Sequence, residues 1–249
     1  MNMMSKDELD DMRYKRIMKW GKFGFADESG KILIPCQWED ASFFSEGLAS
    51  VQGENGRYGY IDKTGKIVIP CQWANAGDFH EGMAYVNEAY EPYGFIDKTG
   101  SIVIPYKWID VQDFHDGLAM VKDTNGKYGF IDKTGKVVIP CKLDSVGSFR
   151  DGLAPIEGPD ETWGFMDTTG KVVIPYKWNK ITWFNEGIAL IQDTNCKYGY
   201  IDKTGKIISP CQWKVAYNFE DGIAVVCDSN DNWLELDRNG LIIGPYHTA

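Results

Sequence analysis

Acidic residues recur at fixed intervals along this chain, and their type and spacing make them the first candidates for chemistry. One acidic residue precedes a glycine in each of six sequence copies: Glu46, Glu81, Asp116, Asp151, Glu186 and Asp221. A second set stands before a short glycine-containing turn: Asp27, Asp62, Asp97, Asp132, Asp167, Asp202 and Asp237. Paired carboxylates can hydrolyse glycosides, and clustered oxygen ligands can bind calcium.

The spacing of these carboxylates argues against both kinds of site. A glycosidase needs one acid and one nucleophile at a single centre, whereas these equivalent residues are spread along the whole chain. A calcium loop needs several ligands at close alternating positions. Instead, a lysine directly follows four aspartates of the second set: Lys63, Lys98, Lys133 and Lys203. We therefore expect both sets to be turn residues.

Cysteines and histidines do not form a convincing site either. Four of the six cysteines fill one repeated position after Ile-Pro or Ser-Pro, and tyrosine replaces them in other copies: Cys36, Cys71, Cys141 and Cys211 against Tyr106, Tyr176 and Tyr246. A metal ligand would not be exchanged for tyrosine in this way, and no Cys-x-x-Cys pair occurs. We predict reduced packing cysteines, with neither a structural metal nor a disulfide.

Known catalytic patterns are also missing from the sequence. His80 and His115 share a column with serine, arginine, asparagine and glutamate, which predicts a solvent-exposed position. No Ser-His-Asp or Cys-His arrangement follows from the spacing, and no glycine-rich phosphate loop occurs. The sequence therefore predicts a protein that is not an enzyme and that needs no cofactor.

The elements that position these residues belong to a tandem repeat. The phrase "YGYIDKTGKIVIPCQW" at 58–73 returns as "YGYIDKTGKIISPCQW" at 198–213. Successive copies start 35 residues apart, as from Tyr58 to Tyr93, without insertion or deletion. Six full copies span 23–232, and a partial copy spans 233–249. A fixed period of this length predicts units that bury their faces against their neighbours.

Each copy predicts three short antiparallel strands. In the fourth copy, 128–132 alternates as a strand, Asp132 and Gly135 predict a tight hairpin turn, and 136–140 returns. Pro140 is expected to end that return strand, because proline cannot donate to a sheet. An irregular stretch of about a dozen residues, such as 71–82, then leads to a third strand, such as 83–86.

Invariant columns indicate the core. Phenylalanine occupies one position in all six copies, and tryptophan recurs at another: Phe44, Phe79, Phe114, Phe149, Phe184 and Phe219, with Trp38, Trp73, Trp108, Trp178 and Trp213. A glycine and an alanine also recur without exception just after the phenylalanine. Large rings facing small residues predict units that interlock with their neighbours.

The chain ends supply fragments that complete a set of seven all-β units. Residues 14–20 stand where a third strand would precede Phe23, and 233–245 has only the first two strands. One arrangement is a β-propeller-like ring in which 14–20 pairs with the last copy. The alternative is an open superhelix of contiguous meanders, the first starting with 14–35. We expect one domain over 14–249 and a leader over 1–13, helical or disordered, with Ser5 and Glu8 as a capping box.

Charge and hydropathy limit the partners and the location. The net charge is −10, and most lysines of the repeat lie close to an acidic residue. Nucleic acids and anionic membranes attract clustered basic residues, so neither is an expected partner. No apolar run approaches the roughly 20 residues of a membrane span, and the start of the chain lacks the features of a signal peptide. These observations predict a cytoplasmic protein.

The repeat resembles the WG-repeat family, also called KWG repeats, found mostly in bacterial proteins. The resemblance rests on "WGFMDTTGKVVIPYKW" at 163–178 and "FNEGIALI" at 184–191, and it covers about residues 14–246. Most copies depart from the name by carrying Tyr-Gly or Phe-Gly; Trp-Gly occurs only at 20–21 and 163–164. The resemblance implies a tandem β-repeat with a binding or scaffolding role, and it implies no enzymatic activity.

Surface variation is what remains to suggest a function. The turn between the third and first strands differs in every copy, as do the positions after the tryptophan. Extra aromatic residues predict an interaction surface: Tyr85, Tyr90, Trp183 and Tyr217. We expect an unidentified protein partner for a non-catalytic interaction module. The alternative is a lectin-like array for carbohydrate or another ligand. An array of sugar sites requires exposed invariant columns, whereas an interaction module requires buried ones.

Overall fold

The described part of the chain is all-β apart from one short helix. A computed structural model describes residues 6–89 and 92–246. The chain divides into two compact units, 1–142 and 143–249. The described residues contain one helix, α1 (Lys6–Asp11), within the predicted leader, and seven antiparallel sheets. Ser5, half of the predicted capping box, lies outside the described residues. The prediction of seven repeated antiparallel meanders, one for each sheet, is confirmed.

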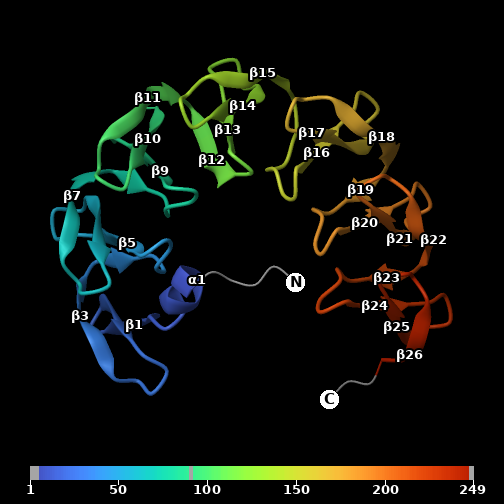
Figure 1. The fold of residues 1–249 in the computed structure, drawn as a ribbon, viewed down its shortest axis with the longest axis horizontal. Helices are drawn as coiled ribbons and strands as arrows, with labels where there is room; N and C mark the ends of the chain where they lie inside the picture. The colour runs from blue at the N-terminus through green and yellow to red at the C-terminus, as the bar shows by residue number, and fades with distance from the viewer. Residues whose placement is uncertain (1–5, 90–91, 247–249) are drawn as a thin grey trace. The chain divides into compact units, whose positions relative to one another are not determined.

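The first unit contains four sheets, which Figure 1 shows in sequence order from blue to green. In the first sheet, β1 (Lys15–Lys19), β2 (Lys22–Ala26) and β3 (Ile32–Trp38) pair. The second has β4 (Asp40–Ala41), β5 (Leu48–Gln52), β6 (Tyr58–Asp62) and β7 (Ile67–Trp73). The third has β8 (Asn75–Ala76), β9 (Met83–Asn87), β10 (Tyr93–Asp97) and β11 (Ile102–Trp108). The fourth has β12 (Asp110–His115), β13 (Leu118–Lys122), β14 (Tyr128–Asp132) and β15 (Val137–Leu143).

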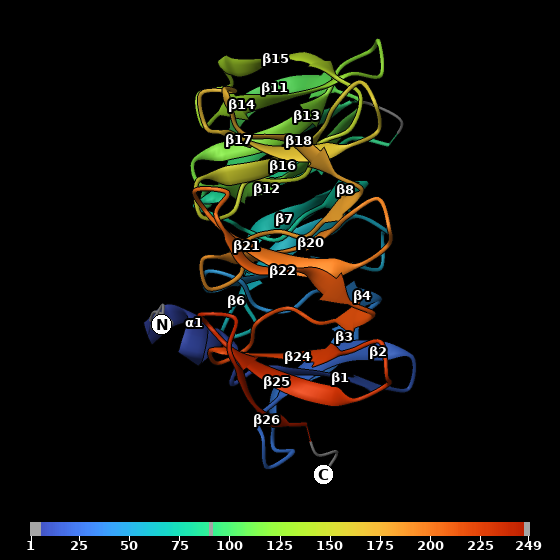
Figure 2. The same cartoon turned by 90° about the vertical axis from the view of Figure 1, so that its right-hand side faces the viewer.

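The second unit contains three sheets, which follow one another as layers in Figure 2. The first has β16 (Leu153–Glu157), β17 (Trp163–Asp167) and β18 (Val172–Trp178). The next has β19 (Lys180–Ile181), β20 (Ile188–Gln192), β21 (Tyr198–Asp202) and β22 (Ile207–Trp213). The last has β23 (Val215–Ala216), β24 (Ile223–Cys227), β25 (Trp233–Asp237) and β26 (Ile242–Pro245).

Every sheet is a contiguous meander, and this order places the N-terminal strand. β1 pairs with β2, from Lys15 opposite Ala26 to Lys19 opposite Lys22, whereas β25 pairs with β24 and β26. The pairing of residues 14–20 with the last copy is therefore wrong. Trp20 and Gly21 both have positive φ and close a hairpin between neighbouring strands. Closing this short loop costs less conformational entropy than pairing with a strand at the other end of the chain.

The aspartate turn forms as predicted. In the second sheet, Asp62 Oδ1 accepts hydrogen bonds from the backbone N–H of Thr64 at 2.9 Å and of Lys66 at 3.1 Å. Gly65 takes a φ of 83°, which a residue with a side chain rarely adopts. The same turn closes the hairpin at Asp132. The second set of aspartates therefore shapes turns.

Proline does not end the return strand, contrary to the prediction. The strand that contains Pro140 continues to Leu143 and is the edge of its sheet, where a missing N–H on the outer side costs little. At the equivalent Pro105 the register shifts, so that β11 bulges opposite Gly94. A Cβ on Gly94 would lie 2.5 Å from the Ile104 carbonyl oxygen, which explains the glycine after the leading aromatic residue of each full copy.

The stretch predicted to be irregular is ordered. In the second sheet, Ser45 and Leu48 exchange backbone hydrogen bonds of 2.8 and 3.1 Å across Glu46 and Gly47. Both turn residues have positive φ, at 52° and 86°, as in a two-residue hairpin turn. Just before this turn, the chain supplies the short fourth strand of five of the seven sheets: β4, β8, β12, β19 and β23.

The core lies between consecutive sheets, as the invariant columns predicted. The phenylalanine column and the tryptophan column are buried in both units. Phe79 packs on Tyr60 of the preceding sheet with ring centroids 4.8 Å apart, and Phe219 packs on Tyr200 at 5.0 Å. Each hydrophobic cluster joins residues from two neighbouring sheets. Neighbouring repeats therefore bury one another's faces.

Candidate functional site

The acidic residues before the column glycines link one repeat to later ones, as Glu46 and Glu81 show. Glu46 Oε2 accepts a hydrogen bond from the Gly82 N–H at 3.0 Å and forms an ion pair with Lys98 Nζ at 3.0 Å. Glu81 contacts the Gly117 N–H and Lys133 in the same way. Partial burial raises the pKa of Glu46, but the bonds from Lys98 and the Gly82 N–H outweigh it and lower the pKa overall.

Helix α1 takes over this linking role at the start of the chain. Asp11 lies 35 residues before Glu46, since 46 − 35 = 11, and so belongs to the same column. Its Oδ2 accepts from the Gly47 N–H at 3.2 Å, and Lys63 Nζ lies 2.8 Å from Asp11 Oδ1. Figure 1 shows α1 next to the β4–β7 sheet. The helix therefore covers the first sheets with a carboxylate that a preceding repeat would otherwise provide.

The histidine column is less exposed than predicted in the first unit. His80 and His115 are half-buried, with ring centroids 5.5 Å apart. His80 Nε2 lies 3.5 Å from Asp113 Oδ2, and burial raises the pKa of Asp113. The equivalent residues of the second unit are exposed: Arg150, Asn185 and Glu220. The column tolerates polar residues because it lies at the edge of each hairpin turn, not because it is fully solvated.

Three of the four predicted interaction residues can be placed. Trp183 and Tyr217, in the second unit, are exposed by 47% and 56%. The Arg150 guanidinium lies 5.1 Å from the centre of the Trp183 ring, and Tyr217 stacks on Trp233 at 6.1 Å. Tyr85 is half-buried in the first unit. Tyr90 lies outside the described residues. Their role in binding stays a prediction.

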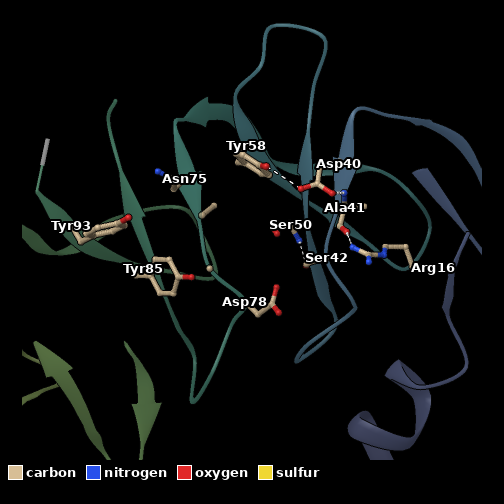
Figure 3. Close-up of a pocket in the computed structure, with 12 residues that line it drawn as sticks. Arg16, Asp40, Ala41, Ser42, Ser50, Tyr58, Asn75, Asp78, Tyr85 and Tyr93 are labelled. Carbon is tan, nitrogen blue, oxygen red and sulfur yellow. Dashed lines mark hydrogen bonds between the residues drawn. The ribbon is translucent and has the colours of Figure 1, made fainter. Parts of the chain in front are cut away.

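A pocket of about 340 Å³ surrounds Tyr85 within the first unit (Figure 3). Its lining comes from β1, from β4 and the segment that follows it, from β5 and β6, from β8 and the segment that follows it, and from β9 and β10. Two carboxylates, Asp40 and Asp78, contribute to the lining together with three tyrosines, Tyr58, Tyr85 and Tyr93. The pocket therefore combines aromatic rings with negative charge.

Hydrogen bonds and ring contacts fix one wall of the pocket. The Tyr58 hydroxyl donates to Asp40 Oδ2 at 3.0 Å, and the Asp40 Oδ1 accepts from the Ala41 N–H at 2.9 Å. Burial and this bond to Asp40 raise the pKa of Tyr58. Arg16 donates to the Ala41 carbonyl oxygen, and its guanidinium lies 5.0 Å from the centre of the Phe43 ring. This wall is thus held before any ligand arrives.

The opposite wall depends on a glycine that makes room for a tyrosine. A Cβ on Gly77 would lie 2.3 Å from the ring of Tyr85, so only glycine fits beside it. Tyr85 contacts Tyr93 edge to face, with ring centroids 5.7 Å apart. Burial raises the pKa of the Tyr85 hydroxyl, and the nearby Asp113 and Asp78 raise it further. The Tyr85 ring is therefore held among carboxylates.

Sequence reasoning did not find this pocket. Asp40, Ser42 and Asp78 come from columns whose residue changes between copies, so no motif shared by all copies marks them. One of the two namesake pairs lies outside the repeated position: Trp20 and Gly21 form the β1–β2 turn, and the Trp20 side chain is 96% exposed. The aligned residue is Phe23, three positions later, which the 35-residue spacing to Tyr58 already indicates.

Among residues 6–89 and 92–246, no group of three or more His, Cys, Asp or Glu side chains is placed to hold a metal ion. Over the same ranges, no helix has the length and apolar character needed to cross a bilayer. The cysteines are free thiols, and burial raises the pKa of Cys71.

Comparisons with known proteins identify the repeat. The family model described as "WG containing repeat" matches residues 23–58, 58–89, 93–128, 128–157, 163–195 and 198–233. No curated protein shows significant sequence similarity to the chain.

Solved structures show a similar fold at low sequence identity. BamB from Moraxella catarrhalis is 15% identical over 94% of this chain and 85% of its own, with a TM-score of 0.50. A eukaryotic initiation factor is 12% identical over 94% of this chain and 73% of its own, with a TM-score of 0.61. The computationally designed Ika8 protein is 11% identical over 93% and 85%, with a TM-score of 0.50. These likenesses show the fold alone and not a function.

Proposed function

The chain belongs to the WG-repeat family, and we propose that it is a non-catalytic module that binds a protein partner through the segments that differ between its repeats. Family membership supports a tandem β-scaffold and leaves the binding surface to the individual sequence. Rigid strands that present divergent segments are a common basis for protein recognition. The partner would therefore contact the stretch between the tryptophan and phenylalanine columns.

The burial of the invariant columns is the observation that carries this proposal. Phe79, Phe114 and Phe149 are fully buried, so the invariant aromatic rings are not available to a ligand. The variable stretches place large side chains on the surface instead, such as Phe43, Trp183 and Tyr217. Aromatic residues of this kind dominate the binding energy of many interfaces.

A repeated carbohydrate site fits the structure less well. Such an array would need the same pocket residues in each copy, exposed in each. The pocket residue Tyr85 is instead replaced at its equivalent positions, by Ser50 in the preceding copy and by Met120 in the next. A single ligand pocket remains compatible with a protein partner, since one side chain of that partner can occupy it.

The proposal is tested by capture and quantification of a partner. The tagged chain is cross-linked in its native host, and each captured protein is then purified and titrated by calorimetry. The double variant Trp183→Ala, Tyr217→Ala should fail to capture one partner by cross-linking. In calorimetry it should bind that purified partner at least tenfold more weakly than the wild type does. Tyr176→Ala is the matched control, because Tyr176 is an exposed aromatic residue outside the variable stretch.

Two results would contradict the proposal. The first is a set of captured proteins that is identical for the wild type, the double variant and the control, with no measurable binding by any purified protein. The second is saturable binding on a glycan array that depends on Trp183 and Tyr217, which would favour the lectin-like alternative.

A further inference from the structure

The pocket around Tyr85 contains a carboxylate without a partner. In the described part of the chain, Asp78 forms neither a hydrogen bond nor an ion pair, although it lines the pocket and is half-buried. Asp40 differs, because it accepts bonds from the Tyr58 hydroxyl and the Ala41 N–H. Figure 3 shows the Asp78 carboxylate on the side of the pocket toward Ser50 and Tyr85. A cation is the natural complement of such a group.

An unpartnered hydroxyl that opens onto the same pocket is a second, independent sign of a ligand. Ser50 is 4% exposed, and its Oγ has no hydrogen-bond partner within residues 6–89 and 92–246. Its backbone N–H is satisfied by Ser42 Oγ at 3.0 Å, so the hydroxyl alone is left over. The Ser50 Oγ is not itself enclosed, so it opens onto the pocket that the residue lines. A ligand that donates hydrogen bonds would satisfy Ser50 and Asp78 together.

The charge around the pocket favours a cation. The three variable stretches of the first unit, 39–43, 74–78 and 109–113, contain five carboxylates and neither lysine nor arginine. Asp113, Asp78 and Asp110 all lie near enough to act on the Tyr85 hydroxyl. The one cation of the lining, Arg16, is already occupied, because it donates to Ala41 and stacks on Phe43.

The tyrosine rings favour a planar cation. We propose that this pocket binds an arginine side chain of the protein partner, with Asp78 as its counter-ion, Ser50 and the Tyr85 hydroxyl as further acceptors, and a tyrosine ring as its stacking surface. A guanidinium has five donors in one plane and can lie flat on an aromatic face, whereas an ammonium is a compact point charge with three donors. This inference rests on the proposed function, since it names the chemistry of that partner.

The size of the pocket agrees with a single side chain. Small-molecule sites span roughly 300–1,000 Å³, and this pocket, at about 340 Å³, lies at the lower end of that range. A flexible side chain can enter such a space while the rest of the partner contacts the surrounding variable stretches. The pocket would thus provide specificity within a larger interface.

The test uses a defined probe and the full chain. Acetyl-Gly-Arg-Gly-amide is titrated into isotope-labelled protein at low salt and followed by NMR. The backbone amides of Ser50, Gly77 and Asp78 should shift and saturate. The citrulline peptide, which has nearly the same shape and no charge, should produce no saturable shift. The lysine peptide should bind at least threefold more weakly than the arginine peptide.

Variants then assign the counter-ion. Asp78→Asn should weaken arginine binding about tenfold, because it removes one partner of a charge pair. Ser50→Ala should weaken it about threefold. Glu54→Gln is the matched control, because it removes the same charge from an exposed turn outside the pocket lining, and it should change the affinity less than twofold.

Clear results would overturn the inference. Equal binding of the arginine and citrulline peptides to the wild-type protein would overturn it. Shifts confined to amides outside the pocket of the wild-type protein would overturn it as well. Lysine binding as tight as arginine would contradict the planar cation. The proposed function is tested separately. A protein partner that is captured by the wild type and lost by the Trp183→Ala, Tyr217→Ala variant supports the proposed function even if no peptide binds. Peptide binding without any protein partner contradicts the proposed function and leaves the pocket assignment intact.

Discussion

The variable stretches of the two units share a backbone and differ in chemistry. In the first unit, the backbone N–H of Gly77 donates to the Tyr85 carbonyl oxygen at 2.9 Å. In the second unit, the backbone N–H of Thr182 donates to the Leu190 carbonyl oxygen at the same distance, 2.9 Å. Stretches 39–43, 74–78 and 109–113 contain five carboxylates and no basic residue. Stretches 144–148, 179–183 and 214–218 contain one carboxylate, two lysines and the exposed Trp183 and Tyr217.

This difference teaches how the repeat separates stability from recognition. The backbone bonds and invariant columns repeat in both units, so they set the fold without reference to the variable side chains. The variable side chains then give each unit its own surface, acidic and hydroxyl-lined around Tyr85 in one, aromatic and partly basic around Trp183 in the other.

The largest expected effect tests whether the scaffold is equivalent in the two units. Phe114→Ala in the first unit and Phe219→Ala in the second should each lower the free energy of unfolding by about 3–5 kcal/mol, because both rings are buried between sheets. Chemical denaturation measures the loss. A melting curve left unchanged by either substitution would show that the invariant column does not carry equal weight in both units.

A smaller effect is expected where the backbone of two strands approaches closely. A Cβ on Gly59 would lie 2.5 Å from the Ile69 carbonyl oxygen, and one on Gly199 would lie 2.7 Å from that of Ser209. Alanine at either position should lower the free energy of unfolding by about 1–3 kcal/mol. Gly244→Ala is the control, because nothing lies within 4 Å of its added Cβ, and it should change stability by less than about 0.5 kcal/mol. Equal losses at all three glycines would refute the steric explanation.

The aspartate turns predict a pH dependence that both units share. The Thr64 hydroxyl, helped by backbone N–H groups, lowers the pKa of Asp62, and Thr204 lowers that of Asp202 in the same way. A carboxyl whose pKa is lower in the folded state stabilises the protein above its unfolded pKa, near 4, and the contribution is lost as pH falls through the folded value. Stability should therefore fall steadily below about pH 4.

Amide substitutions assign that pH dependence to the turns. Asp62→Asn and Asp202→Asn keep the oxygen that accepts the turn hydrogen bonds and remove the charge, so each should flatten the stability curve below pH 4 by a similar amount. Unfolding curves measured from pH 5 to pH 2 provide the comparison. An unchanged slope in both variants would mean that other carboxyl groups account for the acid loss.

The sequence predicted the repeated parts of the molecule and missed the parts that occur once. The phenylalanine column and the Asp62 turn were found because copies repeat them for one physical reason. The continuation past Pro140 was missed because proline is tolerated only through the edge position and the bulge, which depend on the neighbouring strand. The pocket was missed because it needs Ser50 from one repeat beside Asp78 and Tyr85 from the next, and no single column records that combination.

The smallest expected effect transfers one feature of the first unit to the second. Asn218 occupies the column of Asp78, since 78 + 140 = 218, which is four repeats of 35 residues. Asn218→Asp should change stability by less than about 0.5 kcal/mol, because the side chain is exposed. It should also create no arginine site, because the counterparts of Ser50 and Tyr85 there are Leu190 and Val225, which offer neither a hydroxyl nor a ring. The NMR titration with acetyl-Gly-Arg-Gly-amide checks this. A second saturable site of comparable affinity would show that a carboxylate in this column suffices, and that the hydroxyl and the ring contribute nothing.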